Sequence, residues 1–468
     1  MLSNSEFRKQ GHKVIDWIAY YLENIEKFPV KSQVHPGEIR DQLQISAPET
    51  GESIENIFSD FKRIIPAGIT HWQHPGFMAL FPSNASYESM LGEFLAAGLA
   101  INAMVWETSP AATELEERMM DWLKEIFHLP ANFKGVIHDT ASISTLTAII
   151  SAREKYSDFN INKSGFQNYE KLILYCSDQT HYSIEKGAKA AGIGLNNVRK
   201  ITTDENYALQ PDLLIKQIAE DRDNGFQPYM VVATLGTTSS LAFDPLSEIG
   251  KICNDNNLWL HVDAAYAGSA FILEEYQHFL NGIDFADSYV VNAHKWLFTN
   301  FDCSLYFVKD TRHLVNTFSS NPEYLKRTID DVINYKDWGI PLGRRFRALK
   351  LWFVLRSFGV DGLKSKLREH MRLAEMFYEN IQSSPGWEIM APFEMNVLCI
   401  RHHPETIAEN ELNNHNRRIL NKINETGEFF LSGTMLRDNF VIRVVIGQTN
   451  VEERHVWSLL EKLNQNIS

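Results

Sequence analysis

The chain has 468 residues, and 45 lysines and arginines against 59 aspartates and glutamates give a formal net charge of −14. Hydrophobic residues make up 44% and charged residues 22%, which is typical of a folded globular protein and argues against disorder. The acid excess argues against a nucleic-acid partner, because such proteins present basic surfaces. Widely spaced cysteines and the lack of any apolar run near the ~20 residues of a membrane helix favour a cytoplasmic protein without a membrane partner.

The first predicted elements are helices. Apolar residues recur at helical spacing from Val14 to Ile25, which predicts an amphipathic helix over residues 12–26, and a second helix is predicted over Ile54–Ile65. The apolar stripe of the first helix must pack either within this chain or against another subunit. We therefore expect residues 1–86 to form an N-terminal helical segment that takes part in dimerisation.

From residue 87 the pattern changes to alternating helices and strands. Such alternation is typical of a mostly parallel sheet that is covered by helices. The predicted strands are 171–176, 229–235, 258–263 and 287–292, and the predicted helices are 87–100, 113–127, a segment from about 183, and 245–254. We expect a large α/β domain over residues 87–345.

The last part of the chain is again rich in helices. The predicted helices are 347–358, 361–383 and a segment from 451, and the predicted strands lie near 396–401, 428–432 and 440–446. Because these strands follow a run of helices instead of alternating with them, they indicate a separate, small α+β domain. We expect it to span residues 346–468.

Three polar side chains stand where predicted strands end. Asp263 closes one strand, Lys295 follows another, and His181 follows a third. Because parallel sheets bind their ligands outside the carboxyl ends of the strands, we expect these side chains near one site. A buried carboxylate and a buried lysine are costly alone but suit pyridoxal 5'-phosphate (PLP), whose aldehyde needs a lysine amine and whose pyridinium nitrogen needs a carboxylate.

A cofactor with a phosphate group also needs an anion site. Small and hydroxylated residues, among them Thr140, Ala141, Ser142 and Ser144, stand at the start of a predicted helix. The free amides of a helix N-terminus favour a dianion. The same residues also serve as an ordinary helix cap, so both interpretations stay open here.

Six motifs occur in order along nearly the whole chain. They are HWQHPGF (71–77), TSPAATELE (108–116), ATLGTT (233–238), HVDAAYAGSAFI (261–272), NAHKWLFTNFDCS (292–304) and PLGRRFRALKLW (341–352). With them the chain resembles the group II PLP-dependent decarboxylases, and most closely the aromatic-L-amino-acid decarboxylases. The resemblance implies a fold-type I PLP enzyme, an α/β protein with a mostly parallel mixed central sheet covered by helices. It implies a carboxy-lyase that converts an aromatic L-amino acid (tryptophan, phenylalanine, tyrosine or dihydroxyphenylalanine) to the amine and carbon dioxide.

The resemblance also implies roles for individual residues. As catalytic residues, Lys295 would hold PLP as a Schiff base, His181 would stack on its ring, and Tyr324 would help to protonate the carbon that carbon dioxide leaves. The implied cofactor-binding residues are Ala141, Ser142, His181, Thr238, Asp263, Ala265, Asn292, His294 and Lys295. Two alternatives stay open: Tyr335 lies near Tyr324 in the sequence, and His181 could merely cap the helix that follows it.

The substrate pocket and the assembly follow from the same resemblance. The implied substrate-binding residues are Trp72, Phe81, Pro82, Ser83, Asn102, Met104 and Gly343. Relatives of this family are homodimers with the active site at the interface, and Asn102 and Met104 match positions that the second subunit contributes. We expect no metal, because His71 and His74 have no third ligand nearby in the sequence.

Other functions stay open at this point. A related PLP enzyme would form an aromatic aldehyde with consumption of oxygen, or would act on a non-aromatic amino acid; the tyrosine at position 324 favours plain decarboxylation, because relatives with phenylalanine there form aldehydes. The α/β pattern alone also fits a nucleotide-dependent oxidoreductase, although no glycine-rich turn follows a first strand. A non-catalytic scaffold is disfavoured by the joint presence of Asp263, His181 and Lys295.

Overall fold

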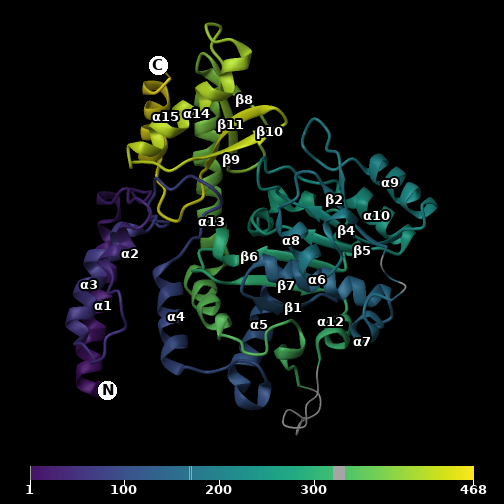
Figure 1. Ribbon diagram of the computed structural model, residues 1–468, viewed down its shortest axis with the longest axis horizontal. Helices are drawn as coiled ribbons and strands as arrows, with labels where there is room; N and C mark the ends of the chain where they lie inside the picture. Colours follow the sequence, from purple (N-terminus) through teal and green to yellow (C-terminus); the bar gives the residue numbers. More distant parts are fainter. Residues whose placement is uncertain (1, 168, 170, 320–331, 468) are drawn as a thin grey trace. The chain divides into compact units, whose positions relative to one another are not determined.

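The computed structural model describes residues 2–167, 169, 171–319 and 332–467. These residues form two compact units, each with its own sheet (Figure 1). The central unit comprises Ser83–Met371 and Ala391–Met395, and the terminal unit comprises Met1–Pro82, Arg372–Met390 and Asn396–Ser468. The division of the sequence into residues 1–86, 87–345 and 346–468 stays a prediction.

A seven-stranded sheet forms the core of the central unit. Its strands are β1 (Lys134–His138), β2 (Leu172–Ser177), β3 (Val198–Ile201), β4 (Gln227–Thr234), β5 (Trp259–Asp263), β6 (Ser288–Asn292) and β7 (Ser304–Val308). They pair in the order β1-β7-β6-β5-β4-β2-β3, and β7 is antiparallel to both of its neighbours while the other pairs are parallel. The loops that follow β1, β2, β4, β5 and β6 therefore meet at one edge of the sheet.

The central unit also contains several helices. They are α4 (Tyr87–Leu99), α5 (Pro110–Ile126), α6 (Ala141–Tyr156), α7 (Ile161–Ser164), α8 (Ser183–Ala190), α9 (Pro211–Asp223), α10 (Leu246–Asn256), α11 (Ala293–Trp296) and α12 (Thr311–Phe318). Helix α6 contacts β4, β5, β6 and β7, and α9 and α10 contact β4 (Figure 1). Strands β2, β5 and β6 are buried over their whole length, as expected for strands that lie between covering layers.

The long helix α13 (Arg347–Ser383) begins in the central unit and ends in the terminal unit. Gly359 interrupts it with φ of 63° and ψ of 173°, a conformation that glycine adopts at little cost because it has no Cβ. The sequence predicted two helices, over 347–358 and 361–383, and the interruption at Gly359 confirms the boundary between them.

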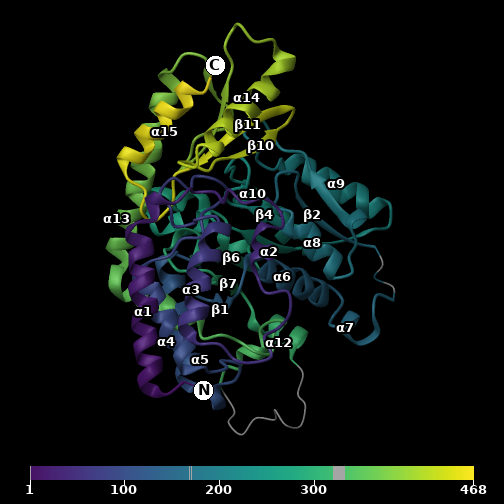
Figure 2. The same ribbon diagram turned by 60° about the vertical axis from the view of Figure 1, so that its left-hand side comes forward.

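The terminal unit combines helices with a four-stranded antiparallel sheet. The strands, in their order in the sheet, are β10 (Ser432–Leu436), β11 (Asn439–Val445), β9 (Val397–His402) and β8 (Trp387–Ile389), and the helices are α1 (Asn4–Glu23), α2 (Glu38–Gln42), α3 (Ile54–Ile64), α14 (Glu409–Glu425) and α15 (Glu453–Gln465). Helices α1 and α3 lie side by side (Figure 2). The ring of Trp17 in α1 packs edge-on against Phe61 in α3, with 4.9 Å between the ring centroids. Trp17, which stands beside the predicted apolar stripe, thus packs within the chain.

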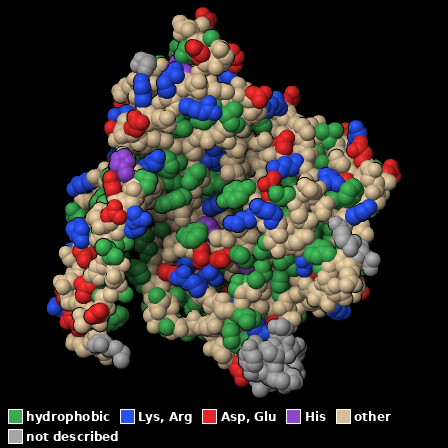
Figure 3. Space-filling model, viewed as in Figure 1, with side chains coloured by type: hydrophobic (Ala, Val, Ile, Leu, Met, Phe, Trp, Pro, Cys, Tyr) green, Lys and Arg blue, Asp and Glu red, His purple; other side chains and the backbone are tan. Residues whose placement is uncertain are grey.

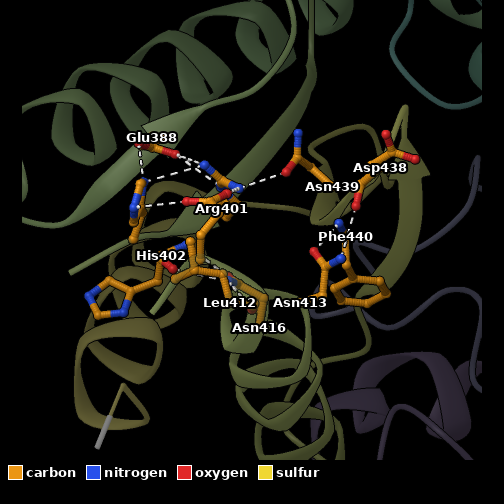
Figure 4. A network of polar contacts seen from close by, with 11 residues as sticks. Glu388, Arg401, His402, Leu412, Asn413, Asn416, Asp438, Asn439 and Phe440 are labelled. Atoms are coloured by element: carbon orange, nitrogen blue, oxygen red, sulfur yellow. Dashed lines mark hydrogen bonds and ion pairs between the residues drawn. The ribbon is translucent and has the colours of Figure 1, made fainter. Parts of the chain in front are cut away.

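Arg401 organises a polar network in the terminal unit (Figure 4). Its guanidinium donates to Glu388 at 2.8 Å, to Glu409 at 3.1 Å and to the side-chain oxygen of Asn439 at 2.7 Å. The Arg401 side chain is only 8% exposed, so these acceptors replace the water that its charge loses on folding. The network joins β8, β9, α14 and β11.

One predicted strand is displaced in the structure. The sequence predicted a strand over residues 428–432, whereas β10 spans Ser432–Leu436. The turn between β10 and β11 is the physical reason: Arg437 adopts a φ of 54° there, and this tight turn fixes which residues pair. In the segment before β10, Phe430 instead makes a single parallel bridge with Phe77.

The helices, the charged surface and the cysteines each bear on an expectation from the sequence. Within the described part of the chain, every helix is either too short or too polar to cross a membrane. Acidic and basic side chains are interspersed over the face drawn in Figure 3. All four cysteines are buried free thiols, and burial raises the pKa of the Cys303 thiol to about 12, so this thiol packs in the core as a neutral group.

Candidate active site

Polar residues close the parallel strands at the edge where their loops meet. The last residues of β1, β2, β4, β5 and β6 are His138, Ser177, Thr234, Asp263 and Asn292. The pairing registers place Thr234 opposite Asp263, and Asn292 opposite Ser304 of β7. His138 lies opposite Ser304 on the other side of β7, so residues that the sequence separates by more than one hundred positions are neighbours at one edge.

Asp263 lies at the centre of this edge. Its side chain is 5% exposed, and one carboxylate oxygen accepts a hydrogen bond of 3.1 Å from the amide of Ala265. The carbonyl of Ala265 in turn accepts a hydrogen bond of 3.0 Å from the amide of Asn292. A buried carboxylate is costly unless a cation or several donors face it, so the arrangement favours a positively charged ligand group.

Lys295 follows β6 on the short helix α11. Asn84 fixes the backbone of this helix, because its amide donates to the carbonyl of His294 at 3.0 Å and its side chain donates to the carbonyl of Lys295 at 2.7 Å. Burial, reinforced by the positive charge of Lys295, lowers the pKa of His294 to about 3, so the His294 ring is neutral. Its Nδ1 lies 2.9 Å from the backbone nitrogen of Cys303, which donates to it.

His181 comes from the loop between β2 and α8. Its Nδ1 accepts a hydrogen bond of 3.2 Å from the amide of Ser183, so the neutral ring carries its proton on Nε2. Burial lowers the pKa of His181 below its ordinary value; the negative charge of Asp263 opposes this shift and the positive charge of Lys295 adds to it. This mutual influence shows that the three predicted residues share one electrostatic neighbourhood.

The start of α6 suits an anionic group. Thr140 precedes this helix, and its hydroxyl donates to Asp139 at 3.1 Å instead of capping the helix. The amides of Ala141 and Ser142 belong to the first turn, where the helix dipole favours negative charge. Nearby in the sheet, Asn292 is buried, and its side-chain oxygen has no hydrogen-bond partner among the described residues. The free amides of this first turn fit a phosphate group, whereas the Asn292 oxygen can only accept a hydrogen bond, so only the nitrogen of that side chain suits a phosphate.

Thr238 lies in a tight turn after β4. The carbonyl of Ala242 closes the turn by accepting hydrogen bonds from the amides of Gly236 and Thr237, at 3.0 and 2.9 Å. Gly236 has a φ of 90°, and a Cβ there would lie 2.6 Å from the Cβ of Ala267, so only glycine fits. The turn leaves Thr238 exposed.

Three of the predicted substrate-binding residues meet in the central unit. The side-chain oxygen of Asn102 accepts a hydrogen bond of 2.9 Å from the amide of Arg344, and its nitrogen lies 3.4 Å from the sulfur of Met104. A Cβ added at Gly343 would lie 3.8 Å from the same nitrogen, which is an ordinary contact. Asn102, Met104 and Gly343 therefore form one cluster.

The remaining predicted residues are distributed differently. Trp72, Phe81 and Pro82 belong to the terminal unit, Ser83 begins the central unit, and Tyr324 lies outside the described residues. Of the two histidines near Trp72, His71 bonds through Nδ1 to the hydroxyl of Tyr21 at 2.7 Å, and His74 accepts from the amide of Gly76 at 2.8 Å.

Sequence reasoning missed two features of the site. Asn84 holds α11 from 211 residues away, and no local pattern indicates such a contact. Arg344 forms a buried ion pair with Glu116 at 2.6 Å and also donates to the carbonyl of Ile137 at 2.9 Å, which anchors the segment that carries Gly343. The motifs PLGRRFRALKLW and TSPAATELE contain the two partners, but each motif carries more than one charge, so the sequence does not show which of them pair.

Comparison with known proteins gives a consistent result. Residues 36–403 match the family described as "Pyridoxal-dependent decarboxylase conserved domain". The chain is 44% identical to phenylacetaldehyde synthase of Arabidopsis thaliana, with 98% of this chain and 96% of that protein covered, and 44% identical to tryptophan decarboxylase 2 of Oryza sativa subsp. japonica, with 97% and 94% covered. The structure of an Oryza sativa TDC with PLP and tryptamine superimposes with a TM-score of 0.97 at 33% identity, and covers 100% of this chain and 98% of that one.

These similarities extend over the whole fold. The mostly parallel mixed sheet with its covering helices, and the small antiparallel sheet near the C-terminus, confirm the predicted fold-type I architecture. The predicted cofactor, PLP, is confirmed as that of the family. The sheet, the strand-end residues and the matches over nearly all of its length together establish that the chain belongs to the pyridoxal-dependent decarboxylase family.

Proposed function

We propose that the protein removes carbon dioxide from an aromatic L-amino acid and releases the amine, with tryptophan, phenylalanine, tyrosine and dihydroxyphenylalanine as candidate substrates. The single observation that carries this proposal is that His181, Asp263 and Lys295 lie at or just after the carboxyl ends of β2, β5 and β6, which meet at one edge of the sheet. The similarity of the whole chain to a tryptophan decarboxylase supports the aromatic substrate class.

In the proposed mechanism each residue of this neighbourhood has one task. Bound PLP supplies an electron sink for the pair that remains when carbon dioxide leaves. The amine of Lys295 would hold the cofactor through its aldehyde. The carboxylate of Asp263 would keep a proton on the pyridine nitrogen of the cofactor, because a negative charge favours the charged form of that nitrogen. The neutral ring of His181 would pack against the cofactor ring without adding charge to it.

We assign the rest of the site in the same way. The first turn of α6, with Ala141 and Ser142, would bind the phosphate together with Asn292 and His294. Thr238 and Ala265 would flank the cofactor ring, and Tyr324 would deliver the proton to the carbon that loses the carboxylate. The proposed substrate pocket consists of Trp72, Phe81, Pro82, Ser83, Asn102, Met104 and Gly343.

We also propose a cytoplasmic homodimer with the active site at its interface. Apolar side chains on α4 support this assembly: Leu91, Leu95 and Leu99 are 51%, 52% and 58% exposed. Burial of these apolar side chains against a second copy of the chain would lower the free energy of the assembly. Measurement of the molar mass in solution tests the assembly, and a fully active monomer at micromolar concentration would contradict it.

Formation of an aromatic aldehyde is the second candidate function. The 44% identity to phenylacetaldehyde synthase, equal to that of the tryptophan decarboxylase, favours considering it. That reaction consumes oxygen and gives hydrogen peroxide, whereas plain decarboxylation consumes none. The two candidate functions therefore differ in products that can be measured directly.

One experiment tests the proposed function. The purified protein, with PLP, is incubated with each of the four aromatic amino acids and with glutamate, and carbon dioxide, amine, aldehyde and hydrogen peroxide are measured. We expect carbon dioxide and amine in equal amounts from at least one aromatic amino acid. Release of carbon dioxide from glutamate alone would contradict the substrate class, and aldehyde with hydrogen peroxide in place of amine would establish the second candidate function.

A further inference from the structure

A buried polar cluster lies under the first turn of α6. The hydroxyl of Ser144 lies 3.1 Å from His138 Nδ1 and 3.3 Å from the hydroxyl of Ser304. Ser144 and Ser304 are completely buried, and His138 is 5% exposed. We call these three residues the α6 cluster. Buried polar side chains that bond to one another fix the positions of the elements that carry them.

The α6 cluster joins three elements at the edge where the candidate site lies. His138 ends β1, Ser304 begins β7 and Ser144 belongs to α6. In the sheet, His138 pairs with Ser304, and Ser304 pairs on its other side with Asn292. Residues directly opposite one another in a sheet share one face, so the α6 cluster continues the row that contains Asn292.

The ring of His138 is fixed and neutral. It stacks on Tyr306 with 5.3 Å between centroids, and a Cβ added at Gly339 would lie 3.1 Å from its Nε2. Burial, and then the positive charge of Arg344, lower the pKa of His138 to about 3. The ring of His138 therefore adds no charge near the proposed phosphate site, and it acts there only by holding Ser144 in position.

We propose that the α6 cluster is a positioning device for the cofactor phosphate, because it sets the distance between the first turn of α6 and Asn292. This inference rests on the proposed phosphate site, in which α6 and Asn292 bind the same group from two sides. The Thr140 hydroxyl donates to Asp139 instead of capping α6. We infer that contacts with the sheet hold the start of this helix, and Ser144 makes such contacts with His138 and Ser304. Removal of either serine hydroxyl would let the two sides of the phosphate site move independently.

A comparison of two ligands separates this role from a general effect on folding. The full chain, stripped of cofactor, is titrated with PLP and with pyridoxal, which lacks the phosphate but carries the same aldehyde for Lys295. We expect Ser144→Ala and Ser304→Ala each to weaken the binding of PLP by about fivefold to tenfold, the effect of losing one buried hydrogen bond, and to leave the binding of pyridoxal unchanged. The matched control is Ser151→Ala, since Ser151 is equally buried on α6 and its hydroxyl has no partner among the described residues.

The outcomes distinguish this inference from the assignment of the phosphate site. Asn292→Ala is the reference variant, and we expect it to weaken PLP binding more than pyridoxal binding. If Asn292→Ala acts in this way but the two serine variants weaken both ligands equally, or weaken neither, the positioning role of the α6 cluster is wrong. If Asn292→Ala affects both ligands equally, the phosphate site itself is misassigned and the inference fails with it. Urea midpoints of all variants show whether each has folded.

Discussion

The buried ion pair between Glu116 and Arg344 allows a quantitative prediction about the segment that carries Gly343. The pair measures 2.6 Å, and its side chains are 2% and 6% exposed. At this separation and an effective dielectric constant of about 20, the attraction amounts to roughly 6 kcal/mol. In Glu116→Gln the guanidinium loses the carboxylate and faces an amide, while the carbonyls of Ile137 and Ala103 still accept from it.

These contacts offset part of the loss, so we expect Glu116→Gln to lower the free energy of unfolding by about 3 kcal/mol. Urea titration followed by circular dichroism measures this change. The control is Asp310→Asn, because Asp310 forms an ion pair of the same 2.6 Å length with Arg312, but the arginine there is 82% exposed. We expect that variant to be almost as stable as the wild type. Equal effects of the two substitutions would refute the reasoning that burial decides the contribution of an ion pair.

Three further predictions concern pH, the terminal unit and the substrate pocket. Burial lowers the pKa of His261 from 6.5 to about 4, so between these pH values the unfolded chain binds the proton and the folded chain does not. The stability of the folded protein therefore falls as the pH drops through this window. We expect His261→Gln to reduce the slope of the unfolding free energy against pH by about 1.4 kcal/mol per pH unit. We expect Arg401→Ala to lower the free energy of unfolding by about 2 kcal/mol in a thermal or urea titration. This is less than for a fully buried pair, because Glu388 is 39% exposed and can be hydrated. An unchanged unfolding midpoint would contradict the role of the network in Figure 4. Gly343→Ser, whose Cβ fits 3.8 Å from Asn102, should raise KM for tryptophan about tenfold relative to tyrosine, and an unchanged KM ratio would exclude position 343 from the pocket.

The sequence allowed the strand-end residues to be predicted because their signals are local. An apolar run followed by Asp263, or by His294 and Lys295, is visible within ten residues, and parallel topology then brings the ends of such strands to one edge. The resemblance to a known family added the roles of these residues and the fold. The charges of Asp263 and Lys295 both act on the pKa of His181, which agrees with the prediction that the three lie near one site.

Other parts of the structure depend on contacts that no local pattern contains. The bonds from Asn84 to α11 arise only when the chain folds back over 211 positions. Strand β10 was predicted four residues too early, because apolar alternation does not reveal the turn at Arg437. Strands β1, β3, β7 and β8 were not predicted; β3 and β8, with four and three residues, are too short to carry a clear apolar pattern. The roles assigned to Tyr324 and to the pocket residues stay predictions.

The most direct test concerns Lys295, which lies on α11 just after β6. The purified protein with PLP is reduced with borohydride and digested, and mass spectrometry locates the lysine that carries the pyridoxyl group. The account predicts this group on Lys295, and predicts that Lys295→Ala loses both the visible absorbance of the bound cofactor and the release of carbon dioxide. A pyridoxyl group on a different lysine, or full turnover by Lys295→Ala, would contradict the account.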